Sequence, residues 1–364
     1  MNRLGTLIIV CLLMGFAYAP AHAEEETTRA FAPRLTELSF DARGAYDLVA
    51  PEMKFSSELS NVRLQGLFFR LGGEILPGLS YTYIHRLNKV VSSGFLESID
   101  HLHLDWRATR WFGISGGKEV VALGGIEYDY APIDIYYTSA FYSVVPCYQW
   151  GASLRFYPSE SDQIQVQVAQ SMLRYWAGEN KANINLMWHG QHGPWRALWS
   201  VSGLQSVDKD WVGYLCIGNR VDILPWLRLD LDAMMRTGLG KETFTGKDWT
   251  FVGELSARPA EQVRVFVRSL YDFNLSGNDA DLFLADGRKA GLAGFGVEYS
   301  PIRNHADLVR FFVAGAYGWG QNVQDGETVK EKDFRFQAGL RFKMDILGTY
   351  RYAQEKRRNA VLTE

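Results

Sequence analysis

The sequence predicts an all-β protein, a 16-stranded antiparallel transmembrane β-barrel with an inward-folded third outer loop. Sixteen short segments alternate apolar and polar residues, and the connectors between them are mostly short and long in turn. Alternation with a period of two gives a sheet with one apolar and one polar face. An even number of such strands with alternating connector lengths is typical of outer-membrane barrels.

The composition agrees with one large β structure. The 364 residues are 14% aromatic, and aromatic residues favour strands; they also include 35 glycines, which favour turns. The formal net charge is -3, so a basic nucleic-acid footprint is absent and no nucleic-acid partner is expected.

The N-terminus resembles an export signal. Arg3 supplies a positive charge, Leu7–Phe16 is an apolar run, and Ala21–Ala23 is a small-x-small cleavage site. A membrane anchor is the alternative, but the apolar run is too short to span a bilayer. We therefore expect a signal peptide at 1–23, followed by a polar periplasmic lead at 24–35.

The barrel is expected over residues 36–345. In one segment Val265 and Val267 share a face, and Arg264 and Arg268 take the other. A charge facing lipid at the midplane costs about 2–4 kcal/mol, so the polar faces are expected to line the lumen. A β-sandwich or propeller is the alternative, but its strands are shorter. The predicted strands are 36–48, 61–72, 78–88, 99–107, 110–118, 148–157, 163–172, 182–189, 193–204, 209–218, 226–236, 247–257, 262–273, 289–300, 308–319 and 333–345.

The lengths of the connectors predict which end of the barrel faces the periplasm and which faces outside. Short ones are expected on the periplasmic side and long ones outside, with 205–208 short where a long one is due. The predicted short connectors are 73–77, 108–109, 158–162, 190–192, 258–261 and 301–307. The predicted long connectors are 49–60, 89–98, 119–147, 173–181, 237–246, 274–288 and 320–332.

The third outer loop, 119–147, has an unusual composition. It is aromatic and apolar, and it carries the polar residues Glu127, Asp129, Asp134 and Tyr136. Because surface loops are normally polar, we expect this one to fold into the lumen as a constriction loop. The alternatives are that it extends the strands above the membrane or packs against a neighbouring subunit.

Three runs in this region resemble a known family. They are Gly116–Lys118, Gly124–Asp129 and Pro132–Tyr136, and they resemble the phosphate-selective porin O and P family, most of all its Bacteroides-type branch. The likeness extends over 36–345 and is specific around 110–157. It implies a 16-stranded porin that forms a homotrimer and whose third loop constricts the pore. No residue of the family's basic lumen ladder is carried over.

The predicted lumen faces hold about two basic groups for each acidic one. Such an excess favours anions where a pore is narrow, whereas a neutralised lattice is the alternative, for example through Arg228 with Asp230 and Arg268 with Asp272. The predicted pore-lining basic residues are Arg43, Arg63, Arg86, Arg107, Arg155, Arg196, Arg228, Arg236, Arg264, Arg268, Arg310, Arg335, Arg341 and Lys343. The acidic ones are Asp41, Asp105, Asp230, Asp232, Glu254, Asp272 and Glu298.

These features predict a passive diffusion channel of the bacterial outer membrane for small hydrophilic solutes, with a mild anion or phosphate preference. Its expected partners are lipid, solutes or anions and two further copies of the chain. No catalytic residue, cofactor or metal is expected. A non-conducting structural or adhesive barrel is one alternative. A barrel hydrolase is another, but the lipid-facing His85 has no evident serine partner.

Three further features of the sequence, a histidine cluster, two cysteines and the C-terminal residues, point to no particular function. His101, His103 and Asp105 have spacing that suits a metal, but Arg107 nearby would repel a cation. Cys147 and Cys216 are expected to be unpaired, because two cysteines make no disulfide framework. Residues 346–364 are expected to form a basic C-terminal extension in the periplasm.

Overall fold

The computed structural model describes residues 33–173, 181–206, 211–239, 246–276, 286–303, 305, 308–324 and 327–351. The predicted signal peptide, residues 24–32 of the lead and the extension beyond residue 351 lie outside these ranges. Of the extension, residues 346–351 are helical. Within the described ranges no helix combines the length and the apolar character needed to cross a membrane.

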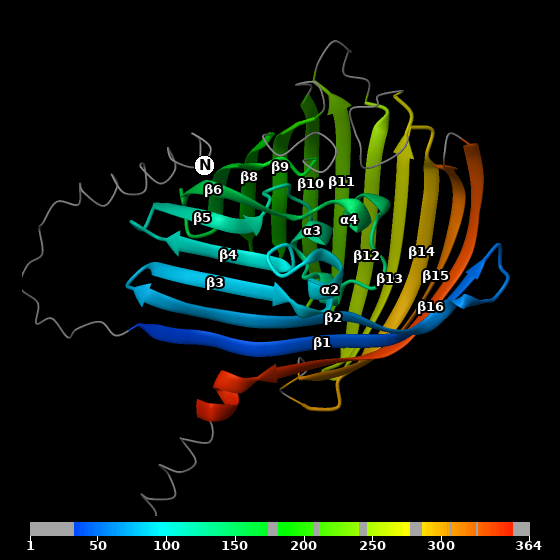
Figure 1. Ribbon diagram of the computed structural model, residues 1–364, viewed down its shortest axis with the longest axis horizontal. Helices are drawn as coiled ribbons and strands as arrows, with labels where there is room; N and C mark the ends of the chain where they lie inside the picture. Colours follow the sequence, from blue (N-terminus) through cyan, green and yellow to red (C-terminus); the bar gives the residue numbers. More distant parts are fainter. Residues whose placement is uncertain are drawn as a thin grey trace, which may run out of the picture. The chain divides into compact units, whose positions relative to one another are not determined.

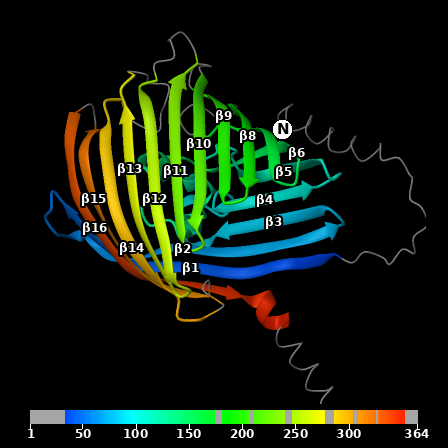
Figure 2. The same cartoon turned by 180° about the vertical axis from the view of Figure 1, so that it is seen from behind.

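Sixteen strands in the described part of the chain form a closed antiparallel barrel, and β1 pairs with β16 to close it (Figure 1). The same wall is seen from behind in Figure 2. The strands are β1 Arg34–Pro51, β2 Ser56–Leu76, β3 Leu79–Arg86, β4 Ile99–Trp106, β5 Phe112–Val120, β6 Tyr148–Phe156, β7 Asp162–Gln170, β8 Ala182–His192, β9 Trp195–Gln205, β10 Trp211–Leu224, β11 Leu227–Gly238, β12 Asp248–Ala260, β13 Val263–Asn274, β14 Lys289–Tyr299, β15 Val309–Gln324 and β16 Glu327–Asp345. The helical turns are η1 Leu87–Lys89, α2 Val90–Ser93, α3 Ile126–Asp129, η2 Pro132–Asp134 and α4 Ala140–Val144.

The barrel is polar inside and apolar outside. On β13, Val267 is 60% exposed, whereas its neighbour Arg268 is 3% exposed. The exposed side chains of the wall include Leu104, Val166 and Phe295, and the buried ones include Gln167, Asn185 and Glu254. A soluble protein has the opposite arrangement, so this surface is built to face lipid.

Two predicted long loops are wrong. The expected loop 49–60 is a tight turn, because β1 continues to Pro51 and β2 begins at Ser56. Likewise β15 and β16 pair through most of the expected loop 320–332. Extending a hairpin pairs backbone groups that a loop would leave to solvent. Polar residues in these extensions hid the alternation that identifies the rest of the strands.

The remaining connectors keep the two ends of the barrel distinct. Turns such as Pro77–Gly78 and 225–226 gather at the end that also holds the start of β1 and the end of β16. We call this the short-turn end. The connectors 87–98 and 121–147 leave from the opposite end, which we call the long-loop end.

Candidate functional site

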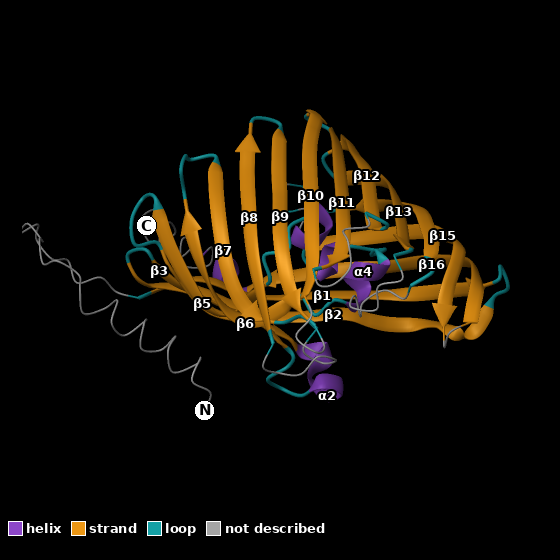
Figure 3. Cartoon of the chain, turned by 90° about the horizontal axis from the view of Figure 1, so that it is seen from above, coloured by secondary structure: helices purple, strands orange, loops and turns teal. Residues whose placement is uncertain are grey.

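The segment 121–147, between β5 and β6, contacts many strands of the wall. Its helices α3 and α4 are drawn within the ring of strands in Figure 1, and α4 is labelled again in the view from above in Figure 3. Near its start, the amide of Gly125 donates to the carbonyl of Leu198 on β9, at 3.1 Å. The two ends of the segment are joined, because the amide of Val121 donates to the carbonyl of Cys147 at 2.9 Å.

Wall side chains hold the backbone of this segment. The Asp232 carboxylate on β11 accepts from the amides of Ile126 and Glu127, at 2.6 and 2.7 Å. Arg43 on β1 donates to the carbonyls of Ile133 and Ile135, at 2.7 and 2.8 Å. Since β11 and β1 lie far apart around the barrel, the segment is attached to separate parts of the wall.

A continuous series of ion pairs joins the segment to β12–β16 and β1. We call it the ion-pair chain, and it contains four arginines and five carboxylates in alternation. Measured distances include 2.6 Å for Glu127–Arg268 and 2.8 Å for Arg264–Glu298. Because each arginine contacts two carboxylates, the basic groups of the chain are fully compensated. In order, its members are Glu127, Arg268, Glu254, Arg264, Glu298, Arg310, Asp134, Arg341 and Asp41.

Tyrosines add neutral bonds between the segment and the wall. The Tyr130 hydroxyl donates to Asp230 at 2.7 Å, and the Tyr136 hydroxyl donates to Glu298 at 2.8 Å. Burial, and then the nearby carboxylate, raise the pKa of both hydroxyls. Both therefore remain protonated donors at neutral pH.

Apolar packing supports the same attachment. Leu123, Phe141 and Val145 of the segment join Tyr214 and Met234 of the wall in one cluster. A second cluster packs Tyr137 of the segment against Phe266, Ala314 and Ala316 of β13 and β15. These contacts explain why so apolar a loop needs no exposure to water.

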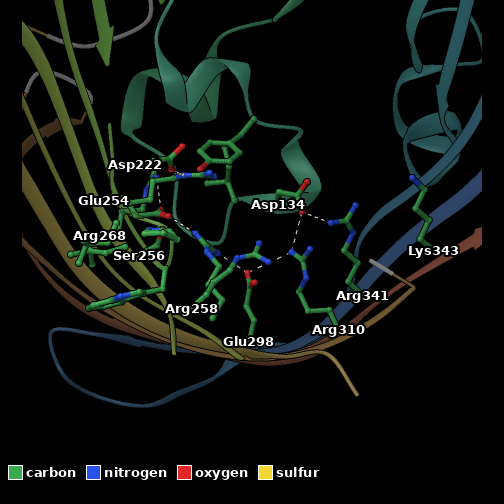
Figure 4. Close-up of a pocket in the computed structure, with 18 residues that line it drawn as sticks. Asp134, Asp222, Glu254, Ser256, Arg258, Arg268, Glu298, Arg310, Arg341 and Lys343 are labelled. Atoms are coloured by element: carbon green, nitrogen blue, oxygen red, sulfur yellow. Dashed lines mark hydrogen bonds and ion pairs between the residues drawn. The ribbon is translucent and has the colours of Figure 1, made fainter. Parts of the chain in front are cut away.

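Several cavities border the segment, and three of them are larger than the rest. The first, of about 280 Å³, lies at the short-turn end and is shown in Figure 4. Its lining includes Asp134 of the segment, Arg258 of β12 and Lys343 of β16. The second, of about 490 Å³, includes Tyr136 and Arg288 and lies toward the long-loop end. The third, of about 280 Å³, faces β4–β9.

The predicted basic residues fall into three groups. Arg43, Arg264, Arg268, Arg310 and Arg341 contact the segment or belong to the ion-pair chain. Arg196 also contacts the segment, through Asp129. The second group has partners elsewhere: Arg86 with Asp100, Arg155 with Asp105 and Glu119, Arg228 with Asp222, and Arg335 with Asp333; Arg63 lies 4.0 Å from Asp47 and Arg236 donates to Thr250. The last two differ: Arg107 lies in the turn after β4, with its guanidinium over the Tyr157 ring, and Lys343 lines the first cavity.

The two neutralising pairs that the sequence offered as examples of the alternative do not form. Arg228 pairs with Asp222 rather than Asp230, and Asp230 pairs with Arg220. Arg268 reaches Glu127 and Glu254, whereas Asp272 accepts from Thr250 and from the amide of Ala140. Partners across neighbouring strands lie closer than residues spaced along one strand, and only the register identifies them.

Sequence reasoning missed Arg220 and Arg258. Arg220 lies beyond the predicted end of its strand, and Arg258 was assigned to a connector. Both continue the alternation of their strands, because β10 runs to Leu224 and β12 to Ala260. Following the even-numbered polar positions 250, 254 and 256 one step further identifies Arg258.

His85 does have a serine partner, contrary to expectation. Its Nε2 lies 2.7 Å from the Ser98 hydroxyl, and its Nδ1 lies 2.8 Å from the Tyr83 hydroxyl. The pair was missed because Ser98 precedes β4 in a connector that folds back. The Ser98 hydroxyl donates to the Phe95 carbonyl at 2.8 Å and is 1% exposed. A serine nucleophile needs access to substrate, which the buried Ser98 hydroxyl lacks.

The structure also shows the histidine pair and the two cysteines that the sequence singled out. His101 and His103 lie side by side, with ring centroids 5.5 Å apart. Among the described residues, no group of three or more His, Cys, Asp or Glu is placed to hold a metal. Cys147 and Cys216 are both free, as the sequence predicts.

Comparison with known proteins supports the fold through structure alone. No protein-family model matches the sequence, and no curated protein matches it. An anion-selective porin from Comamonas acidovorans superposes with a TM-score of 0.62 at 11% identity, covering 86% of this chain and all of that chain. The outer membrane channel DcaP of Acinetobacter baumannii gives 0.61 at 12% identity, covering 88% and 100%. A trimer form of OmpT, an outer membrane protein of Vibrio cholerae, gives 0.52 at 11%, covering 86% and 100%.

This chain therefore has the fold of outer-membrane porins. That fold agrees with the closed 16-stranded barrel and with its apolar outer face. Together they indicate a location in the bacterial outer membrane.

Proposed function

We propose that this protein is a passive outer-membrane channel for small hydrophilic solutes. The observation that carries the proposal is the reversal of polarity across the wall, with polar side chains inside a closed barrel and apolar ones outside. Sixteen strands enclose enough space for an aqueous lumen. The cavities at both faces of the segment 121–147 support a path past it.

Within this proposal, the segment narrows the lumen and sets the size limit for solutes. Its attachment to β9–β11, β13–β16 and β1 supports that role. Residues 1–23 would direct export as a signal peptide. The trimer form of the Vibrio cholerae neighbour supports a homotrimer.

We further propose that the channel has a mild preference for anions. The first cavity is lined by seven basic and four acidic side chains, which supports anion passage. The name of the Comamonas acidovorans neighbour, an anion-selective porin, agrees with it. Phosphate selectivity, which the family resemblance implies, is a narrower form of the same proposal.

The test is electrical recording of the purified protein in planar lipid bilayers. We expect stepwise conductance increases, and a reversal potential in a salt gradient that favours chloride over potassium. Phosphate block of the chloride current would support phosphate selectivity. A folded protein that inserts without conductance would contradict the channel and favour a structural or adhesive barrel. Lipid hydrolysis by the pure protein would favour a hydrolase.

A further inference from the structure

We infer that small anions are selected in the cavity at the short-turn end, where Arg258 and Lys343 are the selecting residues. This inference rests on the proposed channel function and deepens it. It locates charge selection at one mouth rather than among the arginines that touch the segment 121–147.

The arginines next to the segment are poor candidates for selection because carboxylates already occupy them. Arg268 contacts Glu127 and Glu254, and it is 3% exposed. Arg264 contacts Glu254 and Glu298. A permeating anion would have to displace a carboxylate from each of them, which leaves a buried charge unpaired. Their role is to fix the segment to the wall.

Arg258 and Lys343 differ from the arginines of the ion-pair chain. Both line the cavity, one from the end of β12 and one from the end of β16 (Figure 4). Among the residues that the structure describes, neither side chain makes a hydrogen bond or an ion pair. Their charges are therefore available to a solute, and the strands between them carry the compensated Arg264, Glu298 and Arg310.

The two mouths of the path are unequal in charge. At the short-turn end, basic side chains outnumber acidic ones in the cavity lining, seven to four. In the cavity toward the long-loop end, Arg288 and Arg335 are matched by Asp272 and Asp333. Because salt screens charges over about 10 Å, an excess at one mouth acts locally. Anions are thus concentrated at the short-turn end.

The experiment measures the reversal potential of Arg258→Gln and Lys343→Gln, singly and together, in a potassium chloride gradient. Each substitution should lower the chloride-to-potassium permeability ratio by about threefold, as expected for one screened charge about 6 Å from the path. Conductance of the variants shows in the same recording that they are folded and open.

Two controls make the test specific. The exchange Arg258→Lys with Lys343→Arg keeps both charges and should keep the wild-type ratio. Lys330→Gln removes an exposed lysine from the other end of β16 and should also leave the ratio unchanged. The inference is overturned if the double variant conducts with the wild-type ratio, or if Lys330→Gln shifts it equally. Absence of current from the wild-type protein would instead contradict the proposed channel.

Discussion

At the scale of single residues, burial favours the neutral form of the tyrosine hydroxyls and of the thiol in the segment 121–147. Tyr130 and Tyr136 donate to wall carboxylates, and burial raises the pKa of each hydroxyl further above neutral pH. Burial likewise raises the pKa of the Cys147 thiol to about 12. Each of these groups therefore adds a bond or a packing contact without adding a charge to the lumen.

The reactivity of Cys147 tests this burial. In a Cys11→Ser/Cys216→Ser variant, Cys147 is the one remaining thiol. The thiolate is the reactive form, and raising the pKa from 9.0 to about 12 lowers its fraction at pH 8 by roughly a thousandfold. Alkylation by iodoacetamide should be slower by that factor in the folded barrel and should increase with pH up to about 12. The same variant unfolded in urea should react at an ordinary rate. Equal rates in both states would show that the thiol is accessible.

At the scale of elements, the segment and the wall form one unit through the ion-pair chain. Asp134 connects them near the tip of the segment, where it accepts from Arg310 and Arg341. Asp129, also in the segment, pairs with Arg196 and is more exposed, at 40% against 28% for the Asp134 side chain. The two carboxylates therefore offer a matched comparison.

Asp134→Asn should loosen the tip of the segment. The substitution weakens two charge-assisted hydrogen bonds, at a cost of about 2 kcal/mol, and leaves two arginines with one carboxylate fewer. We expect a noisier and larger single-channel conductance together with a stronger anion preference. Asp129→Asn should change both quantities less. If the two variants behave alike in bilayer recordings, Asp134 does not hold the segment in place.

The elements also show what the sequence can predict. A strand such as Val263–Asn274 is recognisable because lipid on one side and water on the other impose alternation on every residue. The extension of the hairpin between β1 and β2 is hard to predict because both of its faces are exposed and the alternation fades. The contacts of Arg228 with Asp222 and of Ser98 with His85 depend on register and on how a connector folds back. Composition alone does not determine either.

At the scale of the whole molecule, the closed barrel is stable only if its outer surface matches the lipid. The wall is closed by β1 and β16, so no edge of the sheet is open where all sixteen strands pair. The β1–β2 hairpin extends past this closed part, since β2 begins at Ser56 but Phe68 is its first residue that pairs with β3. Outward residues of the wall and of the hairpin therefore face different surroundings.

Val267→Arg and Val62→Arg test that difference. Val267 lies in the middle of β13 and is 60% exposed, whereas Val62 lies on the hairpin extension and is 81% exposed. An arginine at position 267 must enter the hydrocarbon, which should lower the free energy of unfolding by about 2–4 kcal/mol. The same change at position 62 meets water and should lower it by less than about 0.5 kcal/mol. Urea unfolding in lipid vesicles, followed by tryptophan fluorescence, measures both. Equal losses would mean that the hairpin is also embedded in the bilayer, and no loss at position 267 would mean that β13 does not face lipid.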